Sequence, residues 1–345
     1  MKRLTLRRPD DWHLHLRDDA ALAAVLPHTA AQFARAIVMP NLRPPVTTTA
    51  LARAYRERIL AALPDGMDFE PLMTLYLTDH SEPAEIELAR ASGTVIGCKL
   101  YPAGATTHSD SGVTDIRRID AVLERMAAVG MPLLVHAEVT AADVDVFDRE
   151  HRYIADVLVP LQARLPELRI VLEHATTRAA IDFVRASKRN VAATLTPQHL
   201  AMNRNALFAG GIRPHHYCLP VLKRETDRIV LLEAATGGDP RFFLGTDSAP
   251  HGRLTKETAC GCAGIYAAHG ALELYAEVFD SVGRLDRLEA FASEHGPRFY
   301  GLPLNSGTVT LEQRDWIVPQ SYPYADGDVL VPLRAGESLA WRLQR

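Results

Sequence analysis

The sequence lacks the features that mark several large classes of protein. No apolar run approaches the ~20 residues that a membrane-spanning helix needs. The N-terminus carries positive charge, but no apolar stretch follows it as in a secretory signal peptide. The 38 lysine and arginine residues face 42 aspartate and glutamate residues, so the net charge is −4 and no basic surplus is available for nucleic acid. We therefore expect a cytoplasmic protein that binds neither membranes nor nucleic acid.

Cysteine is scarce, and its spacing excludes one further class. The four residues are Cys98, Cys218, Cys260 and Cys262, and no two of them form a Cys-x-x-Cys pair. We expect reduced thiols rather than the disulfide framework of a small secreted domain. Buried packing is the expected state of Cys218, Cys260 and Cys262, for which the sequence suggests no chemical role.

Short apolar runs alternate with longer segments of helical periodicity along the 345-residue chain, which is long enough for one α/β barrel or two ordinary domains. Eight runs are predicted strands: residues 12–16, 36–39, 72–77, 95–100, 133–136, 169–173, 191–195 and 242–245. The predicted helices are residues 20–33, 48–63, 83–91, 115–129, 154–165, 177–187 and 227–236. This alternation predicts a (β/α)8 TIM barrel. A doubly wound sheet would usually show a glycine-rich turn after its first strand, and none is present.

Three segments depart from this alternation. Residues 102–112 are small, polar and bounded by glycine, and they directly follow a strand, as does a mobile lid over an active site. Residues 203–222 form a long connection. Residues from about 302 to 345 carry proline and glycine between short β-like runs. We expect this last segment to be a C-terminal extension packed on the barrel, within a single domain of residues 1–345.

Nearly every predicted strand runs into a polar residue at its C-terminal end. Polar residues end strands in many proteins, so one such end means little. In a barrel, however, all eight ends gather at the face that carries the catalytic residues. Six residues at these ends can bind a metal ion or transfer a proton, and we predict that they form one site: His13, His15, Lys99, His136, His174 and Asp247.

The first predicted strand contains the sequence Trp-His-Leu-His-Leu-Arg. Side chains alternate along a strand, so His13, His15 and Arg17 share one face, and two imidazoles at this spacing can reach one metal ion. The same spacing is found in histidines that are only solvated or hydrogen-bonded. The opposite face carries residues that we expect to pack: Trp12, Leu14 and Leu16.

The donor set of the predicted site suits zinc or a similar divalent ion. Four imidazoles and a carboxylate are too many for one ion that keeps an open position, which favours two metals. By strand alternation Lys99 faces into the barrel and Cys98 faces outward. An ammonium beside divalent cations is costly. Lys99 is therefore either a neutral amine that forms a Schiff base or a carbamate that bridges two metals, and the surrounding histidines favour the carbamate.

The last predicted strand ends at Asp247, within Gly-Thr-Asp-Ser-Ala-Pro-His. A carboxylate beside a metal-activated water can take its proton and return it later. Arg17, Asn41 and His251 stand at or just beyond strand ends, where they could hold a substrate carboxylate. Asparagine and histidine are also common as loop caps, but their place on the same rim favours a binding role.

Six motifs together resemble a known family. They are His-Leu-His-Leu-Arg, Met-Pro-Asn, Gly-Cys-Lys-Leu-Tyr-Pro-Ala-Gly-Ala-Thr-Thr, Val-His-Ala-Glu, Leu-Glu-His-Ala-Thr and Gly-Thr-Asp-Ser-Ala-Pro-His. The sequence resembles the dihydroorotases, and among them the shorter, monofunctional bacterial type of the amidohydrolase superfamily. Residues 217–224 and 260–264 extend the resemblance over essentially the whole chain. His-x-His alone would indicate only the superfamily.

The resemblance implies a metal centre of two zinc ions per subunit. The implied ligands are His13, His15 and Asp247 for the more buried ion, and His136 and His174 for the other. The implied bridges between the ions are N6-carboxylated Lys99 and a hydroxide. Asp247 would also be the catalytic acid and base.

The resemblance also implies how the substrate is held. The implied substrate-binding residues are His15, Arg17, Asn41, His136, Leu219, His251 and Ala263. Among these, Arg17, Asn41 and His251 would bind the substrate carboxylate, whereas Leu219 and Ala263 would contact the pyrimidine ring through their backbone. The implied lid residues are Thr106 and Thr107.

The implied activity is the reversible cyclisation of N-carbamoyl-L-aspartate to dihydroorotate, with loss of water, in pyrimidine biosynthesis, usually by a homodimer. The nearest alternative is a hydantoinase or an allantoinase. Substrates of those enzymes lack the ring carboxylate, so Arg17, Asn41 and His251 favour the dihydroorotase. A non-catalytic barrel protein is a further alternative, but it would be expected to have lost ligands, and all six predicted positions are filled.

Overall fold

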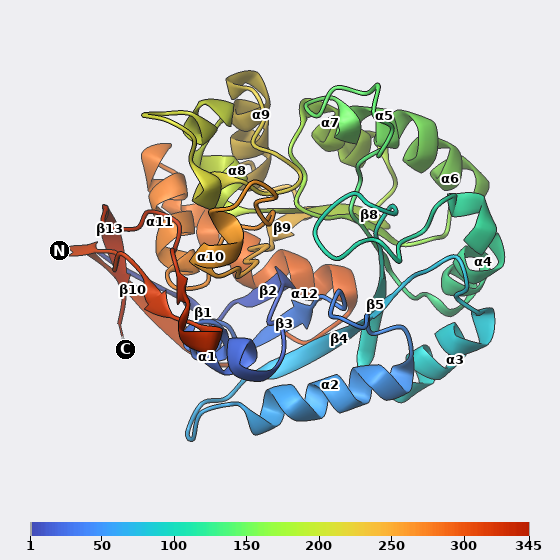
Figure 1. Cartoon of the computed structure of the whole chain (residues 1–345), viewed down its shortest axis with the longest axis horizontal. Helices are drawn as coiled ribbons and strands as arrows, with labels where there is room; N and C mark the ends of the chain where they lie inside the picture. The colour runs from blue at the N-terminus through green and yellow to red at the C-terminus, as the bar shows by residue number, and fades with distance from the viewer. Residues whose placement is uncertain (1, 345) are drawn as a thin grey trace.

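The computed structural model describes residues 2–344 and contains a parallel barrel surrounded by helices (Figure 1). Its eight strands pair in chain order. They are β2 (Asp10–Leu14), β3 (Arg35–Val38), β4 (Glu70–Tyr76), β5 (Val95–Leu100), β6 (Leu133–Val135), β7 (Ile170–Leu172), β8 (Val191–Leu195) and β9 (Phe242–Leu244). A parallel bridge between Leu14 and Ser248 joins the ends of the first and last strands. The predicted barrel and its eight strands are confirmed.

The helices cover the outside of the barrel. They are α1 (Asp19–Ala30), α2 (Thr49–Ala61), α3 (Pro83–Ser92), α4 (Asp120–Val129), α5 (Arg149–Tyr153), α6 (Val159–Arg164), α7 (Arg178–Ala186), α8 (Pro197–Ala201), α9 (Glu225–Thr236), α10 (Arg253–Lys256), α11 (Ala271–Ser281) and α12 (His295–Tyr300). Five of these helices were not predicted from the sequence: α5, α8, α10, α11 and α12. Helix α11 has apolar residues at helical spacing, such as Leu272, Tyr275 and Phe279, so its pattern could have been recognised in the sequence. No helix between residues 2 and 344 is both long and apolar enough to cross a membrane.

The C-terminal segment packs on the barrel, as expected. Strand β10 (Thr308–Ile317) lies between β13 (Ser338–Leu343) and β1 (Arg3–Arg7), an N-terminal strand that the sequence analysis missed. Strands β11 (Tyr322–Pro323) and β12 (Val329–Leu330) form a separate antiparallel pair. The amide of Leu343 donates to Glu273 of α11, which ties the end of the chain to the helical layer. That residues 1–345 form a single domain stays a prediction.

The first barrel strand contains an irregularity that changes one predicted orientation. Between Asp11 and Leu14, β2 carries one residue more than the paired part of β3, which is a bulge. As a result Trp12 points into the barrel, where its ring stacks on Tyr300 with centroids 4.6 Å apart. The prediction that Trp12 shares the outer face with Leu14 and Leu16 is therefore wrong. The indole instead fills the barrel interior in an apolar layer with Phe243 and Tyr300.

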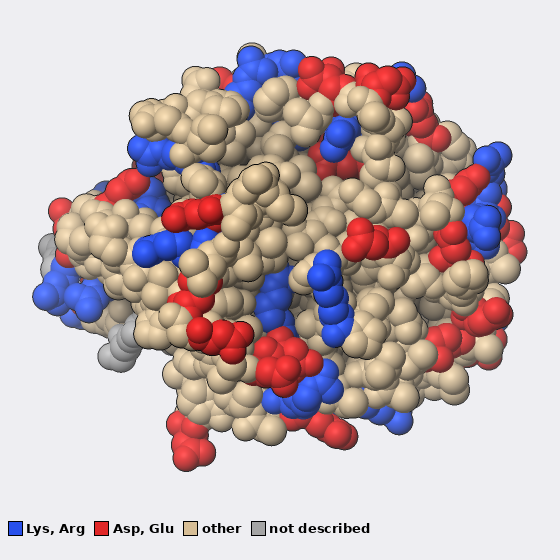
Figure 2. All heavy atoms as spheres, in the orientation of Figure 1, with Lys and Arg blue, Asp and Glu red and all other residues tan. Residues whose placement is uncertain are grey.

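The surface charges agree with the prediction from the composition, whereas the burial of the thiols agrees with its prediction only in part. On the face drawn in Figure 2, acidic and basic side chains are intermixed, as the small net charge predicts. All four cysteines are free thiols. Cys98 and Cys218 are buried, but Cys260 is exposed and Cys262 is half-buried, because both lie in an irregular loop after α10. The prediction of buried packing is wrong for Cys260.

Candidate metal and substrate site

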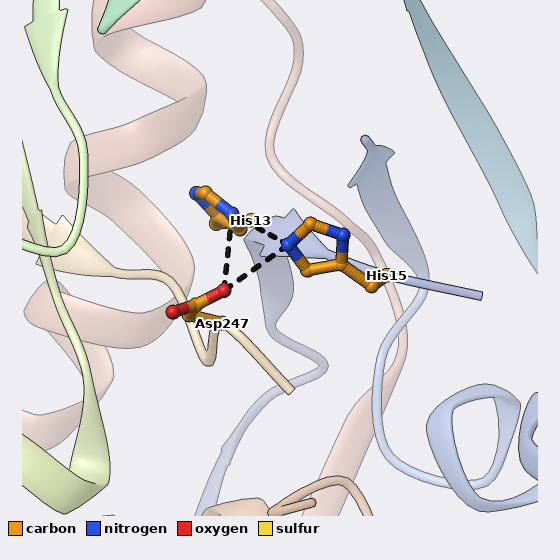
Figure 3. Close-up of side chains that lie close together, drawn as sticks. All are labelled: His13, His15 and Asp247. Carbon is orange, nitrogen blue, oxygen red and sulfur yellow. Dashed lines mark hydrogen bonds and ion pairs between the residues drawn. The ribbon is translucent and has the colours of Figure 1, made fainter. Parts of the chain in front are cut away.

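Three predicted ligands converge on one point at the C-terminal face of the barrel (Figure 3). Nε2 of His13 lies 3.3 Å from Nε2 of His15, and Oδ1 of Asp247 lies 3.3 Å from the first and 3.2 Å from the second. All three side chains are buried. Two imidazole nitrogens and a carboxylate oxygen that face one another at this spacing form a donor set that fits a divalent metal ion.

A buried carboxylate at the barrel seam sets the geometry of this group. Asp11 accepts hydrogen bonds from the amide of Thr246 at 2.9 Å, from the Thr246 hydroxyl at 2.6 Å and from the amide of His13 at 3.1 Å. In addition, the amide of Asp247 donates to the carbonyl of His13 at 2.9 Å. Burial raises the pKa of Asp11 to about 6. These bonds hold the ends of β2 and β9 together, so the ligands on the two strands meet.

Three site residues adopt a backbone conformation that is unusual for a side chain with a Cβ. The φ angles of Arg17, His174 and Asp247 are 60°, 42° and 45°, in the left-handed region. Such strain is found most often at functional sites, where surrounding contacts enforce it. At His174 the enforcing contact is a hydrogen bond from its amide to the Thr194 hydroxyl at 2.7 Å.

Lys99 is fully buried and faces into the barrel as predicted, and its ammonium pairs with Glu173. The Glu173 carboxylate also lies 3.2 Å from Nδ1 of His13, so it contacts the nitrogen opposite the metal-facing one. Burial lowers the pKa of the Lys99 amine against the opposing effect of Glu173. No role was predicted for Glu173, and neighbouring residues of a regular strand point to opposite faces, so one beside His174 would normally face outward. The strained backbone at His174 lets both side chains face inward.

The other two predicted histidines lie beside this group, and the ring centroid of His174 is 5.0 Å from that of His13. His136 and His174 approach edge to face, with ring centroids 4.8 Å apart. Nε2 of His136 donates to buried Glu138 at 2.9 Å, an arrangement that fixes the ring and directs its other nitrogen. Nδ1 of His174 is buried and has no hydrogen-bond partner among residues 2–344. Glu138 is the last residue of the Val-His-Ala-Glu motif, but no role was predicted for it from the sequence.

The residues predicted to hold a carboxylate form two contacts at the rim. Nη2 of Arg17 donates to Nε2 of His251 at 2.9 Å, and burial together with the Arg17 charge holds the pKa of His251 well below its usual value. Oδ1 of Asn41 accepts from Nδ1 of His15 at 2.8 Å, while its amide nitrogen lies 3.5 Å from the carbonyl of Thr107. Arg17 thus presents a cationic donor beside the metal ligands, and Asn41 joins the ligand His15 to the lid.

A small cavity of about 20 Å³ brings most of these residues together. It is lined by His13, His15, Arg17, Asn41, Tyr101, Thr106, Thr107, His136, His174, Leu219, Asp247, Ala249, Ala263 and Gly264. Of the predicted site residues, only Lys99 and His251 are absent from this lining: Lys99 is fully buried, and His251 lies behind Arg17. A larger open hollow, lined in part by residues 113–117, residues 138–141 and α6, contains none of the converging histidines.

The predicted lid lies across this cavity. The hydroxyl of Thr107 accepts from the amide of Ala263 at 3.1 Å and lies 3.5 Å from the Ala263 carbonyl. Within the loop, the Ser109 hydroxyl donates to the carbonyl of Thr106 at 2.6 Å and accepts from its amide. The loop is therefore closed onto the backbone that is predicted to contact the substrate ring. That it opens during turnover stays a prediction.

The comparisons with known proteins agree with this geometry. A model of the Amidohydrolase family matches residues 11–319. The dihydroorotases of Azoarcus sp. (strain BH72) and Aromatoleum aromaticum are 66% and 65% identical over 343 residues, covering 99% of this chain and 100% of each relative. The solved dihydroorotase of Campylobacter jejuni is 35% identical with a TM-score of 0.91, covering 99% of this chain and 98% of that one.

Two further solved structures place these similarities in context. The dihydroorotase of Saccharomyces cerevisiae, solved in complex with 5-fluoroorotic acid, is 30% identical with a TM-score of 0.91, and the match covers 100% of this chain and 99% of that one. The L-hydantoinase of Arthrobacter aurescens is only 17% identical, with a TM-score of 0.81 over 98% of this chain and 82% of that one. The hydantoinase likeness therefore shows the shared fold alone.

The loop after His174 is held by one buried carboxylate from α5. Glu150 accepts hydrogen bonds from the amides and hydroxyls of both Thr176 and Thr177, at 2.6–3.1 Å. It is almost fully buried, and burial raises the pKa of its carboxyl against these bonds. Because Thr177 also caps α7, Glu150 anchors the loop that joins His174 to the start of that helix.

Replacing Glu150 with alanine leaves four buried donors without this acceptor. We expect Glu150→Ala to lower the free energy of unfolding by about 1–3 kcal/mol and to reduce metal retention at limiting metal concentration. Denaturant titration and metal analysis after gel filtration measure the two effects. The matched control is Asp227→Ala. Asp227 is less buried than Glu150 and accepts a hydrogen bond from the amide of Arg178, the first residue of α7. Equal losses in both variants would contradict the role of Glu150.

Proposed function

The chain belongs to the amidohydrolase family and, within it, to the dihydroorotases, and on that premise we propose how its cavity interconverts N-carbamoyl-L-aspartate with dihydroorotate and water. The enzyme acts on the C–N bond of a cyclic amide. The observation that supports this assignment best is one cavity in which a metal-binding triad lies beside the Arg17–His251 pair. Hydrolysis of the amide needs the metal-binding triad, and binding of the ring carboxylate needs the Arg17–His251 pair.

We propose a centre of two zinc ions. His13, His15 and Asp247 hold one ion through the atoms that already converge in the structure. His136 and His174 hold the other; the unpartnered, buried Nδ1 of His174 and the Glu138-oriented ring of His136 support this pairing. Bound there, the ions lower the pKa of a shared water toward neutrality and polarise the substrate carbonyl.

Lys99 is the proposed bridge. Its burial lowers the amine pKa, which favours the neutral amine that reacts with carbon dioxide. The amine nitrogen forms a bond to the carbon of CO2 and releases one proton, and the product is a carbamate anion with two oxygen ligands. This change removes the positive charge that is paired with Glu173. Glu173 then keeps its contact with Nδ1 of His13 and orients that ligand.

Asp247 moves the proton in the proposed mechanism. Burial alone would raise the pKa of its carboxyl, but His13 and His15 hold it well below the usual value, so Asp247 is an ionised base. In the hydrolytic direction it takes the proton of the attacking water as that water adds to the ring carbonyl. It then delivers the proton to the ring nitrogen as the C–N bond breaks. Cyclisation runs these steps in reverse.

The remaining residues hold the substrate. Arg17 donates to the ring carboxylate, supported by Asn41 and His251 on the same rim. The backbones of Leu219 and Ala263 contact the pyrimidine ring, and Thr106 and Thr107 close the lid over it. The alternatives, a hydantoinase or an allantoinase, act on substrates without a ring carboxylate and would have no use for Arg17 in this position. The proposal also includes a cytoplasmic location, which the free thiols support. It further includes a homodimer, which the resemblance to the dihydroorotases supports.

The proposed centre can be measured directly. Protein prepared with zinc and 13C-labelled bicarbonate is expected to contain two zinc ions per chain and to show a carbamate carbon signal by NMR. Lys99→Arg retains the positive charge but cannot form a carbamate, so it should lose this signal, most of the zinc and all turnover. Chelation of the metal should abolish wild-type activity, and added zinc should restore it. One zinc ion per chain without a carbamate would contradict the proposed centre.

The proton transfer predicts a second result. Asp247→Asn should retain the fold, as judged by circular dichroism and melting temperature, but lose a factor of at least ~10² in turnover, because an amide cannot accept the proton. Turnover in both directions and zinc content are measured together. Asp280→Asn, which removes a carboxylate far from the cavity near Lys2 and Trp341, serves as the control. A near-normal rate in Asp247→Asn would refute the assignment.

The carboxylate contact predicts a change of specificity. Arg17→Gln should lower kcat/KM for dihydroorotate roughly 10- to 100-fold, since a hydrogen bond to a charged group contributes about 1.5–3 kcal/mol. Any activity toward hydantoin, which has no carboxylate, should change little. The matched control is Arg58→Gln, because the exposed Arg58 side chain pairs with Asp18 and lies over the Tyr55 ring, outside the cavity lining. An equal loss on both substrates would favour the hydantoinase alternative.

A further inference from the structure

A buried lysine outside the metal centre contacts both backbone segments that are assigned to the pyrimidine ring. Lys256 ends the short helix α10, and its side chain is almost fully buried. Its ammonium donates to the carbonyls of Tyr217 at 2.8 Å, Cys262 at 2.8 Å and Gly264 at 2.7 Å. These three bonds use all three ammonium protons. No carboxylate forms an ion pair with Lys256 within residues 2–344.

The three carbonyls belong to two loops that are far apart in the sequence. Tyr217 lies two residues before Leu219, and Cys262 and Gly264 lie on either side of Ala263. The amide of Gly264 also donates to the carbonyl of Tyr217 at 3.0 Å, so the loops meet at this point. Lys256 therefore holds both loops from behind the cavity that Leu219, Ala263 and Gly264 line.

The bonds to Cys262 and Gly264 also determine the direction of the peptide between them. With both carbonyls directed at Lys256, the amide of Ala263 points into the cavity, where it donates to the Thr107 hydroxyl at 3.1 Å. Gly264 has a φ of 152°, and a Cβ there would lie 2.7 Å from the carbonyl of Ala249 and 2.8 Å from His251. The loop thus has little room to adopt another position.

The arrangement is costly for packing alone. Burial lowers the pKa of the Lys256 amine to about 8, against a smaller opposing effect of the Cys218 and Cys262 thiols. An apolar side chain of similar length would fill the same space without this desolvation. What it could not do is hold three carbonyls from two loops at fixed separations.

We propose that Lys256 is a positioning residue that fixes the Leu219 and Ala263 backbones at the separation required by the pyrimidine ring. It acts on affinity for the ring and takes no part in metal binding or proton transfer. This inference rests on the proposed ring-binding role of Leu219 and Ala263. Lys256 lies outside the cavity lining, yet in this proposal it determines the geometry of the surface that binds the substrate.

The test compares Lys256→Met with the wild-type holoenzyme. We expect KM for dihydroorotate to rise roughly tenfold or more while kcat changes less than about threefold, the pattern of a lost contact that is equal in ground and transition states. Zinc content and the carbamate signal should be unchanged. Amide hydrogen exchange should accelerate in residues 217–219 and 262–264. Lys256→Arg, which retains a cationic donor, should recover part of the affinity for the substrate.

The matched control is Gln32→Met. Gln32 is also buried and also joins two segments, since its side chain donates to the carbonyl of Ala268 at 2.6 Å and accepts from the amide of Leu272 at 3.0 Å. It lies away from the cavity lining. This variant should lose stability without a change in KM, which separates a general loss of packing from a loss of positioning.

Several outcomes would overturn the proposal. They are an unchanged KM in Lys256→Met, a loss of zinc that accompanies the rise in KM, and an equal rise in KM in Gln32→Met. If Lys256→Met does not fold, Lys256→Arg provides the test. A wild-type KM together with unaltered amide exchange in residues 217–219 and 262–264 would support the proposal. A wild-type KM together with faster exchange in these residues would overturn it. A wild-type enzyme that does not turn over dihydroorotate would refute the proposed function instead, and the exchange measurements would still report on the two loops.

Discussion

The site depends on the closure of the barrel between its first and last strands. Asp11 makes that closure specific, because its buried carboxylate binds the amide and hydroxyl of Thr246 as well as the amide of His13. Together with the bonds from the amide of Asp247 to the carbonyl of His13 and from the amide of His15 to the carbonyl of Ser248, these contacts hold the two histidines against Asp247. The bulge beside Asp11 has the same effect, since it lets His13 face inward immediately after Trp12. One seam therefore provides both the apolar floor of the barrel and half of its metal site.

Buried carboxylates recur behind the ligands. Glu173 contacts His13 and Lys99, Glu138 contacts His136, and Glu150 holds the loop that follows His174. Each one fixes a ring or a backbone that a metal ion would need in a single orientation. Lys256 has the corresponding role on the substrate side, where it holds carbonyls instead of imidazoles. Buried charged side chains outside the cavity thus orient the imidazoles and the backbone that line it.

Much of the fold could be predicted because strand and helix periods are local. The eight barrel strands were found from apolar runs, and the barrel followed from their alternation with helical segments. Strand β1 was missed for a physical reason, because it is half-exposed and isolated from the repeat. Helix α11 was also missed, although its apolar residues recur at helical spacing. Trp12 was placed on the wrong face because a bulge cannot be recognised from alternation alone.

The sequence by itself determined the fold class, the family and the chemical types at the strand ends, because these depend on local pattern and on motifs. It also indicated that Arg17 shares a face with the histidines. Only the tertiary structure decided which side chains meet across the barrel. Glu173 reaches His13 and Lys99, and Lys256 reaches two loops, through contacts between segments that no local period connects. Such contacts arise when the strand ends are brought together in a ring, and a linear pattern carries no record of their distances.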